Sequence, residues 1–404
     1  MKKILIFSTT YFPFVGGAEI AVKEITNRVT DVQFDMITLR FDRKLPKFEK
    51  IGNVNIYRIG FTKKSPTMAD LIKFPLKLNK TFFPITACWK ATKLNKKNKY
   101  DAVWSIMAAF AGFAGMFFKW THKKIPFLLT LQEGDPISEI KAKVNFIKPL
   151  FKRIFLKADI IQAISIYLGD WAKDMGFDKQ VEIIPNAVDT KKFSKEYPEN
   201  ELNELKMKLG KKENDIFLIT TSRLVKKNAI DDVIKSLKYL NTNIKFIILG
   251  TGPDLISLKD LVELEDASNR VMFVGQTEYD EIPKYLKISD IFIRPSLSEG
   301  FGNSFIEAMA SGTPVITTQV GGITDFIFSP QKNMNRKPTG IFVNATDSKD
   351  IAEKIKFLLN NKEIKNEIIK NAKELVLEKY DWNLIAKNMK ERVFSSLLGG
   401  LASG

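Results

Sequence analysis

Two glutamates, Glu299 and Glu307, lie eight residues apart in the stretch 290–322, which reads DIFIRPSLSEGFGNSFIEAMASGTPVITTQVGG. This stretch predicts a buried strand at 291–293, a helix at 304–310 and a second strand at 314–317. A loop with two glycines joins the first strand to the helix. Backbone N–H groups converge where a strand ends and a helix begins, so such a loop suits a phosphate.

Each glutamate also has a simpler interpretation. The pattern Ser304-x-x-Glu307 matches a capping box, in which the glutamate side chain closes the first helical turn. Glu299 could be a loop carboxylate in contact with solvent. Spacing alone leaves both interpretations open.

A cluster of cations follows another predicted strand, residues 215–221. The loop reads Ser222-Arg223-Leu224-Val225-Lys226-Lys227-Asn228, and Asn228 is the expected N-cap of the next helix. Cations at a helix N-terminus are unfavourable for the helix dipole unless an anion sits there. The loop is therefore either an anion-binding loop or a solvated basic loop.

The stretch 290–322 resembles the signature of the retaining nucleotide-sugar glycosyltransferases of family 4, which have the GT-B fold. Their pattern E-G-F-G-x-x-x-x-E-A-M-A-x-G-x-P-V-I matches this chain without a gap from Glu299 to Ile316. The resemblance implies an α/β protein of two Rossmann-like domains facing across a cleft, with a C-terminal helix crossing back to the first domain. It implies that Glu307 holds the donor's ribose hydroxyls and that Glu299 faces the donor sugar. The donor-binding residues implied beside them are Phe301, Gly302, Asn303 and Ser304.

Further loops resemble those of the family. Pro13-x-x-Gly16-Gly17-x-Glu19 is similar to its first loop, so Gly16 and Gly17 are implied donor contacts. Gly250 belongs to a G-x-G-P turn, and Gly275-Gln276 is where relatives hold the nucleobase through backbone groups. The loops of the second half all lie at the carboxyl ends of predicted strands, where open α/β sheets bind ligands.

The catalytic set implied by the resemblance is Glu299, Arg223 and Lys227. Arg223 matches the arginine that clamps the donor diphosphate. The accompanying lysine of relatives falls at Asn228 here, so Lys227 or Lys226 must substitute for it.

The acceptor side departs from the family pattern. Many members have a histidine near the acceptor where this chain has Gln132, and Glu133 and Asp135 are candidate acceptor contacts. His122 is the only histidine and Cys88 the only cysteine, so neither histidine acid–base chemistry nor a Cys/His metal site is expected. No D-x-D motif is visible. We therefore expect no metal and no cofactor, the substrate being a nucleotide sugar of UDP or GDP type.

The length of 404 residues predicts two domains. We place the acceptor-side domain at 1–190 and the nucleotide-sugar-binding domain at 191–380. Residues 381–404 form the crossing helix and a tail. The run 184–189, Ile-Pro-Asn-Ala-Val-Asp, resembles the family's linker into the second domain, with Ala187 in place of glycine.

The positive charge is concentrated in the first half. The chain has a net charge of +17; residues 1–190 hold 31 Lys and Arg against 17 Asp and Glu, and the remainder holds 32 against 29. Residues 63–99 contain ten lysines, one acidic residue (Asp70) and several aromatic residues. This segment is a solvated helical face, a contact for an anionic membrane surface or lipid carrier, or a nucleic-acid surface. We find no nucleic-acid motif and expect no such partner.

The apolar run 102–118 is at the lower length limit for a membrane span. A strand at 102–106 followed by a buried helix is the favoured interpretation. The N-terminus resembles a first strand, not a signal peptide. We expect a cytoplasmic protein, with peripheral attachment to the inner face of the membrane as the alternative.

The resemblance and the loops together predict a retaining glycosyltransferase of the hexosyltransferase class. It would move a sugar from a nucleoside-diphosphate sugar to a glycan or lipid-linked acceptor in cell-envelope polysaccharide biosynthesis. Two alternatives remain open: a GT-B sugar-nucleotide epimerase, and a non-enzymatic binder of anionic polymers.

Overall fold

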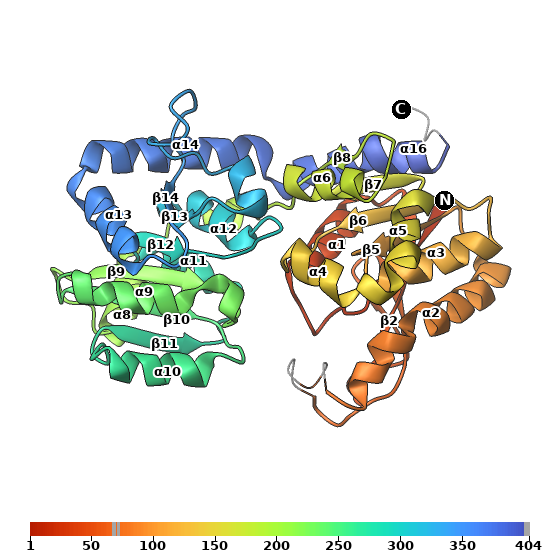
Figure 1. Ribbon diagram of the computed structural model, residues 1–404, viewed down its shortest axis with the longest axis horizontal. Coiled ribbons are helices and arrows are strands. Elements are labelled where there is room, and N and C mark those ends of the chain that lie inside the picture. Colours follow the sequence, from red (N-terminus) through yellow and green to blue (C-terminus); the bar gives the residue numbers. More distant parts are fainter. Residues whose placement is uncertain (67–69, 71–72, 400–404) are drawn as a thin grey trace. The chain divides into compact units, whose positions relative to one another are not determined.

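The chain folds into two compact units, shown by a computed structural model that describes residues 1–66, 70 and 73–399 (Figure 1). The first unit contains Met1–Asn186 and the described residues from Trp382 onward, and the second contains Ala187–Asp381. Residues 400–404 of the tail predicted at 399–404, and Leu71 and Ile72 of the basic segment, lie outside the described residues.

The first unit is built on a sheet in the order β3-β4-β2-β1-β5-β6-β7-β8. Among the strand pairs of this sheet that the structure describes, only β3–β4 is antiparallel. The strands are β1 (Lys2–Phe7), β2 (Val32–Leu39), β3 (Phe48–Ile51), β4 (Val54–Ile59), β5 (Ala102–Ile106), β6 (Phe127–Leu131), β7 (Ile160–Ala163) and β8 (Glu182–Ile183). β1, β5 and β6 are covered on both faces, which explains their nearly continuous apolar sequences.

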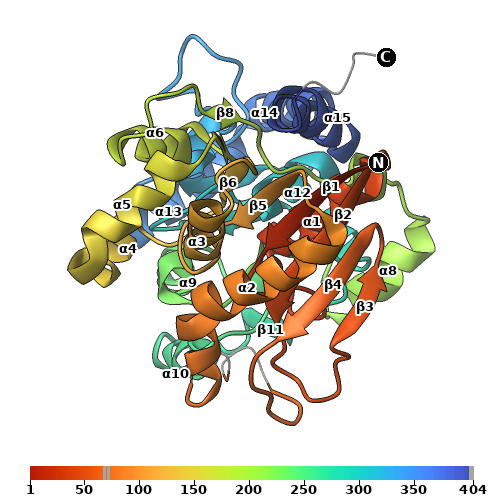
Figure 2. The ribbon, with the colours of Figure 1, turned by 90° about the vertical axis from the view of Figure 1, so that its right-hand side faces the viewer.

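Helices cover both faces of this sheet. They are α1 (Gly17–Arg28), α2 (Leu76–Asn98), α3 (Ala111–Thr121), α4 (Ile137–Lys143), α5 (Lys148–Lys157), α6 (Ile166–Asp174), α15 (Trp382–Asn388) and α16 (Ser395–Leu397), with the 3-10 turn η2 (Asn145–Ile147) and the π-helix η6 (Met389–Phe394). α2, α3 and α5 lie side by side (Figure 2), and α1 packs on α15.

The apolar run 102–118 forms the buried strand β5 and most of α3, as the sequence predicted. Within the part of the chain that the structure describes, no helix combines the length and apolar character needed to cross a bilayer.

The last helical segment returns to the first unit. Phe394 packs against Phe34 and Trp104 at ring distances of 5.8 and 5.3 Å. Arg392 pairs with Glu182 at 2.6 Å. The return of the C-terminal helix to the first unit confirms this part of the predicted fold.

The second unit is built on an all-parallel sheet in the order β11-β10-β9-β12-β13-β14. Its strands are β9 (Ile216–Thr221), β10 (Ile244–Leu249), β11 (Val271–Gly275), β12 (Ile291–Arg294), β13 (Val315–Thr318) and β14 (Ile341–Val343). Its helices are α7 (Thr190–Phe193), α8 (Glu199–Lys208), α9 (Ile230–Ser236), α10 (Leu255–Leu264), α11 (Ile282–Lys287), α12 (Asn303–Ser311), α13 (Ser348–Asn360) and α14 (Lys362–Lys379), with the 3-10 turns η3 (Lys226–Asn228), η4 (Leu237–Tyr239) and η5 (Gly321–Asp325).

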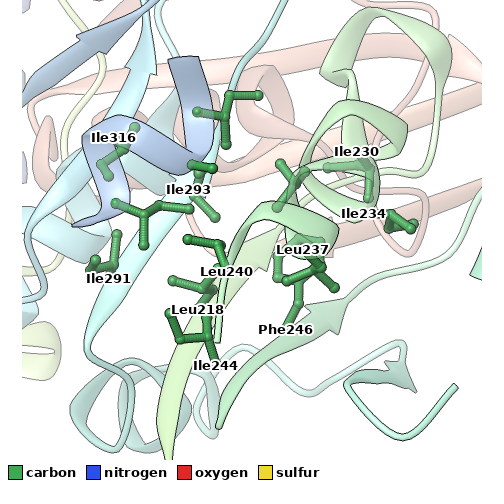
Figure 3. Close-up of a cluster of buried hydrophobic side chains, with 14 of the residues drawn as sticks. Leu218, Ile230, Ile234, Leu237, Leu240, Ile244, Phe246, Ile291, Ile293 and Ile316 are labelled. Carbon is green, nitrogen blue, oxygen red and sulfur yellow. The ribbon is translucent and has the colours of Figure 1, made fainter. Parts of the chain in front are cut away.

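Aliphatic side chains from the strands and from α9 form the core of this unit (Figure 3). Leu218 of β9, Ile293 of β12 and Ile234 of α9 are completely buried. This packing fixes the strand ends, and therefore the loops that follow them. The α/β class with parallel sheets, predicted from the sequence, is confirmed.

Candidate active site

The loops after β9, β10, β12 and β13 are joined by backbone hydrogen bonds at one edge of the second sheet. Leu224 N donates to Thr251 O over 3.0 Å, Leu297 N donates to Lys227 O over 2.7 Å, and Gly322 N donates to Glu299 O over 3.1 Å. The four loops therefore converge as the sequence predicted.

Two glycines allow this close approach. A Cβ atom on Gly250 would lie 1.9 Å from Ser222 O, and one on Gly321 would lie 1.9 Å from Glu299 O. Both glycines also have a positive φ, +135° and +50°. Any side chain at either position would push two loops apart.

Glu299 lies between two cations. Its Oε1 accepts a hydrogen bond from Arg294 Nη2 over 2.9 Å, and its Oε2 lies 3.7 Å from Lys227 Nζ. The side chain is only 13% exposed. The interpretation of Glu299 as a solvated loop carboxylate is wrong, because the preceding strand supplies a guanidinium directly beneath the loop.

Arg294 is a site residue that the sequence analysis missed. It is 5% exposed, donates to Ser296 Oγ (3.1 Å) and Ser304 Oγ (2.8 Å), and stacks 4.3 Å from the Phe305 ring centre. Burial lowers the pKa of its guanidinium, and the negative charge of Glu299 opposes that shift. The available signal was a charged residue at the end of an apolar strand.

Glu307 is buried, with 7% of its surface exposed. Tyr279 Oη donates to Glu307 Oε1 over 3.2 Å. Burial raises the pKa of Glu307 to about 7, although the Tyr279 hydrogen bond and the charges of Arg294 and Lys192 oppose the shift. An empty site therefore leaves this carboxyl close to the midpoint of its titration at neutral pH.

The capping-box interpretation of Glu307 is wrong. α12 begins at Asn303 with Gly302 at its N-cap, and no side chain caps it. Glu307 consequently lies beyond the first turn, and Ser304 Oγ is engaged by Arg294. Gly302 can occupy the N-cap because its φ of +94° is accessible to glycine.

Tyr279 and Lys192 come from distant segments and were also missed. Lys192 Nζ lies 4.9 Å from the Tyr279 ring centre and 2.5 Å from Asp280 Oδ1. The ring of Phe193 also packs against Tyr279, with 5.5 Å between the ring centres. No local spacing links these residues to Glu307, so only the fold reveals them.

The structure separates the three cations of the loop after β9. Lys227 reaches Glu299, whereas Arg223 and Lys226 are exposed. Asn228 is buried and donates through Nδ2 to Arg223 O over 2.6 Å. Its expected role as the N-cap of α9 is wrong, because α9 begins at Ile230 after Ala229, which has a left-handed backbone.

The remaining predicted donor residues lie around the same edge. Gly275 O accepts from Gly250 N over 2.7 Å, and Gln276 is exposed next to it. The Phe301 side chain packs into the core against Phe326 at 5.0 Å. Any contact of Phe301 with a donor must therefore be made by its backbone.

The predicted residues of the first unit form two groups. In the first, the carboxylate of Glu19 accepts from Gly16 N over 2.8 Å and from Thr10 Oγ1 over 2.5 Å. This contact fixes the turn into α1, which begins at Gly17, and leaves both glycines exposed.

The second group follows β6. Gln132 and Glu133 are buried, whereas Asp135 is exposed. Gln132 Oε1 accepts from Asn186 Nδ2 over 3.5 Å, and Glu133 Oε1 accepts from Ala108 N over 2.6 Å. Burial raises the pKa of Glu133 to about 7.

Family models match both halves of the chain. The model described as Glycosyltransferase Family 4 matches residues 15–192, and the model described as Glycosyl transferases group 1 matches residues 202–375. The chain belongs to the family 4 glycosyltransferases. It is therefore an enzyme, as the sequence predicted.

Relatives of this family 4 enzyme extend over most of its length. An uncharacterised glycosyltransferase of Methanocaldococcus jannaschii is 25% identical over 414 residues, which cover 98% of this chain and 99% of the relative. An alpha-monoglucosyldiacylglycerol synthase of Streptococcus pneumoniae is 26% identical over 78% of this chain and 70% of its own.

Solved structures with the same fold include two that match almost the whole enzyme. Sucrose-phosphate synthase from Thermosynechococcus elongatus has a TM-score of 0.81 at 20% identity, covering 99% of this chain and 100% of that one. Anabaena HepE in complex with UDP-glucose has a TM-score of 0.77 at 19% identity, covering 98% and 100%. These likenesses confirm the GT-B fold.

The family 4 enzyme offers no grouped metal ligands in residues 1–66, 70 and 73–399. No three His, Cys, Asp or Glu side chains there are placed to hold one ion. Independence from metal ions stays a prediction.

Proposed function

We propose that this enzyme transfers a hexosyl group from a nucleoside-diphosphate sugar to a glycan or lipid-linked acceptor, with retention of the anomeric configuration. The observation that carries the proposal is the meeting of Lys227 and Glu299, 3.7 Å apart, from two loops joined by backbone hydrogen bonds. A cation and a carboxylate at the carboxyl ends of neighbouring strands suit a ligand that carries a diphosphate next to hydroxyl groups. The cation would meet the diphosphate, and the carboxylate would accept hydrogen bonds from the hydroxyl groups.

The first chemical requirement is to stabilise the departing nucleoside diphosphate. Arg223 and Lys227 would supply positive charge where negative charge develops, and loop N–H groups would add fixed dipoles. Removing one such preorganised donor typically costs about 2.7–4 kcal/mol of transition-state stabilisation. Arg223 is suited to this role because it is exposed in a loop whose backbone Asn228 fixes.

Retention follows if the acceptor attacks the face that the diphosphate leaves. The bond between the anomeric carbon and the phosphate oxygen breaks, and the bond to the acceptor oxygen forms on the same side. The leaving phosphate takes the acceptor's proton. Such a route needs no histidine base, and none of the proposed site residues is a histidine.

Glu307 would accept hydrogen bonds from the donor's ribose hydroxyls. Its carboxylate is buried beside Tyr279, where water has little access. The hydroxyl groups of a bound ribose would supply the hydrogen-bond donors that this carboxylate lacks. Glu307→Ala is expected to lower kcat/KM by at least about 100-fold.

The acceptor class is supported by the names of relatives. One is an alpha-monoglucosyldiacylglycerol synthase, whose name specifies a lipid product. A cytoplasmic location with peripheral attachment to the membrane, through the basic segment 63–99, is part of the proposal.

The test begins with thermal-shift measurements of the full chain against a panel of UDP and GDP sugars. A donor at about 100 times its Kd should raise the free energy of unfolding by about 2.7 kcal/mol. Transfer and hydrolysis assays with the best donor then distinguish transfer from epimerisation. Repeating these assays with EDTA tests the predicted independence from metal ions. A chain that no nucleotide sugar stabilises, or that epimerises the donor without transfer, would contradict the proposal.

A further inference from the structure

Three neighbouring helices of the first unit carry only positive charge. α2 has six lysines, α3 has one, and α5 has three lysines and an arginine, and none of the three contains Asp or Glu. α2 contacts α3, and α3 contacts α5 (Figure 2). We call these three helices the basic layer.

The helices on the opposite face of the same sheet carry charges of both signs. The chain crosses from β1 to β2 in one direction along the sheet and from β4 through β5 and β6 to β7 in the other. Right-handed crossovers therefore put α1 on one face and the basic layer on the other. α1, the α15 that packs on it and the η6 that follows α15 hold five basic and three acidic residues, so most of the excess charge belongs to the face of the basic layer.

α2 also exposes a line of apolar side chains. Phe82, Ile85 and Trp89 are 50%, 64% and 62% exposed, and their spacing of three and four residues puts them on one face. We call them the α2 stripe. The helix buries a second line on its other side, comprising Phe83, Ala87 and Ala91.

Both lines together make α2 unlike an ordinary surface helix, whose outer face is polar. Lys93 Nζ lies 3.5 Å from the centre of the Trp89 ring, so a cation flanks the stripe directly. Aromatic and aliphatic residues beside lysines are typical of helices that lie in the membrane interface.

We propose that the basic layer docks on an anionic lipid bilayer and that the α2 stripe enters the interfacial region. Anionic headgroups complement the lysines, and the acyl boundary removes the stripe from water. A hydrophilic polyanion would satisfy the charges but leave Ile85 exposed. Pairing of two copies through this layer would bring like charges together, which is unfavourable. The inference rests on the peripheral attachment proposed above and names the helices and side chains that would make it. It can fail while the transfer reaction stands, because these helices lie outside the proposed donor site.

The test is sedimentation of the full chain with vesicles of phosphatidylglycerol and phosphatidylcholine, compared with pure phosphatidylcholine vesicles. Binding is expected only to the anionic vesicles and should weaken as salt is added. The triple variant Phe82→Ser, Ile85→Ser, Trp89→Ser should bind at least about tenfold more weakly. The matched control Ile256→Ser, Leu264→Ser, Leu377→Ser removes three exposed apolar residues of the second unit and should bind like wild type.

Charge is tested separately. Lys77→Gln, Lys96→Gln, Lys97→Gln should weaken binding by about 100-fold, whereas Lys356→Gln, Lys362→Gln, Lys370→Gln on exposed positions of α13 and α14 should have little effect. Thermal melts establish that each variant is folded, and nucleotide-sugar binding without vesicles should be unchanged in all four variants.

Tryptophan fluorescence gives an independent readout. Trp104, Trp171 and Trp382 are buried, whereas Trp120 of α3 is 38% exposed, so the measurement is made in a Trp120→Phe background. In that background Trp89 should dominate any blue shift when anionic vesicles are added, and Trp89→Phe should remove most of it. Four results would overturn the proposal: equal binding to neutral vesicles, no binding to either, wild-type binding by the stripe variant, or self-association without vesicles that the stripe variant abolishes. Equal affinity for heparin in wild type and stripe variant, with no vesicle binding, would assign the layer to a polyanion instead.

Discussion

Arg294 Nη2 donates a hydrogen bond to Glu299 Oε1 over 2.9 Å, at the point where β12 ends and the signature loop begins. Both side chains are largely withdrawn from water, at 6% and 13% exposure. Glu307, the second glutamate of the signature, has a neutral hydroxyl partner instead. The two carboxylates therefore differ in environment, with Glu299 held by a fixed positive charge and Glu307 held by Tyr279.

Substitution of Arg294 tests whether this pair positions Glu299. Arg294→Met should lower the free energy of unfolding by about 3–5 kcal/mol, because it leaves a buried carboxylate without its main partner. It should also lower kcat more than it raises KM. Arg294→Lys should recover part of the stability but less of kcat, since an ammonium cannot reproduce the guanidinium fork that also contacts Ser296 and Ser304.

Urea unfolding and steady-state kinetics of both variants provide the measurement. A folded Arg294→Met enzyme with wild-type kcat would show that the arginine is only structural.

Arg223 and Lys226 form a matched pair of exposed cations in one loop. Arg223→Ala should lower kcat/KM by at least about 100-fold if its guanidinium meets the departing diphosphate. Lys226→Ala should change it little, because Lys227 and not Lys226 approaches Glu299. Steady-state kinetics at constant ionic strength separate the two. Similar losses in both variants would point to general attraction of an anionic donor.

The sequence predicted those parts of the site that are encoded locally. The loop around Glu299, the cations after β9 and the glycine turn at Gly250 each follow an apolar run and each lie at a strand end. Parallel strands bring such ends to one edge, so their convergence could be inferred without coordinates.

The contacts that fix the two glutamates could not be inferred in this way. Arg294 directly follows the predicted strand 291–293, and nothing in the local sequence indicates its partners; Tyr279 lies 28 residues from Glu307 in the chain. The capping box at Ser304 failed because Gly302, with its positive φ, begins the helix earlier than the pattern suggests. β3 was missed as well, since its alternating burial is that of an edge strand and gives a weak apolar signal.

Donor binding should depend on pH through Glu307. Its pKa of about 7 in the empty site means that the carboxyl is half protonated near neutrality. Ribose hydroxyls that donate to the carboxylate favour its ionised form, so binding should release a proton. Affinity should rise by about tenfold between pH 6 and 8 and then level off.

Calorimetry with an intact nucleotide sugar, in two buffers of different ionisation heat, measures both the affinity and the released proton. An intact nucleotide sugar is used because, unlike a free nucleoside diphosphate, it has no terminal phosphate that itself gains a proton near neutral pH. Glu307→Gln should bind more weakly and with little pH dependence. Tighter binding at low pH would mean that a protonated Glu307 donates to the ligand, contrary to the proposed role.

Glu133 allows a prediction about stability. It is 7% exposed, its Oε1 accepts from Ala108 N, and its Oε2 has no hydrogen-bond partner among the described residues. Burial raises the pKa of this carboxyl from 4.5 to about 7. Between about pH 4.5 and pH 7, the folded chain thus keeps a proton on Glu133 that the unfolded chain releases.

Because the folded-state pKa is the higher one, the unfolded chain binds fewer protons between these two values, and the free energy of unfolding falls as pH rises from about 4.5 to about 7. Glu133→Gln cannot ionise and should lack this part of the decline. The wild type should therefore lose about 3 kcal/mol more than Glu133→Gln between about pH 4.5 and pH 8. Urea unfolding across that range measures how steeply the free energy of unfolding falls with pH in each protein. A change in stability that the amide causes equally at every pH does not affect this comparison of slopes. Parallel pH profiles for the two proteins would mean that Glu133 ionises as readily in the folded chain as in the unfolded one.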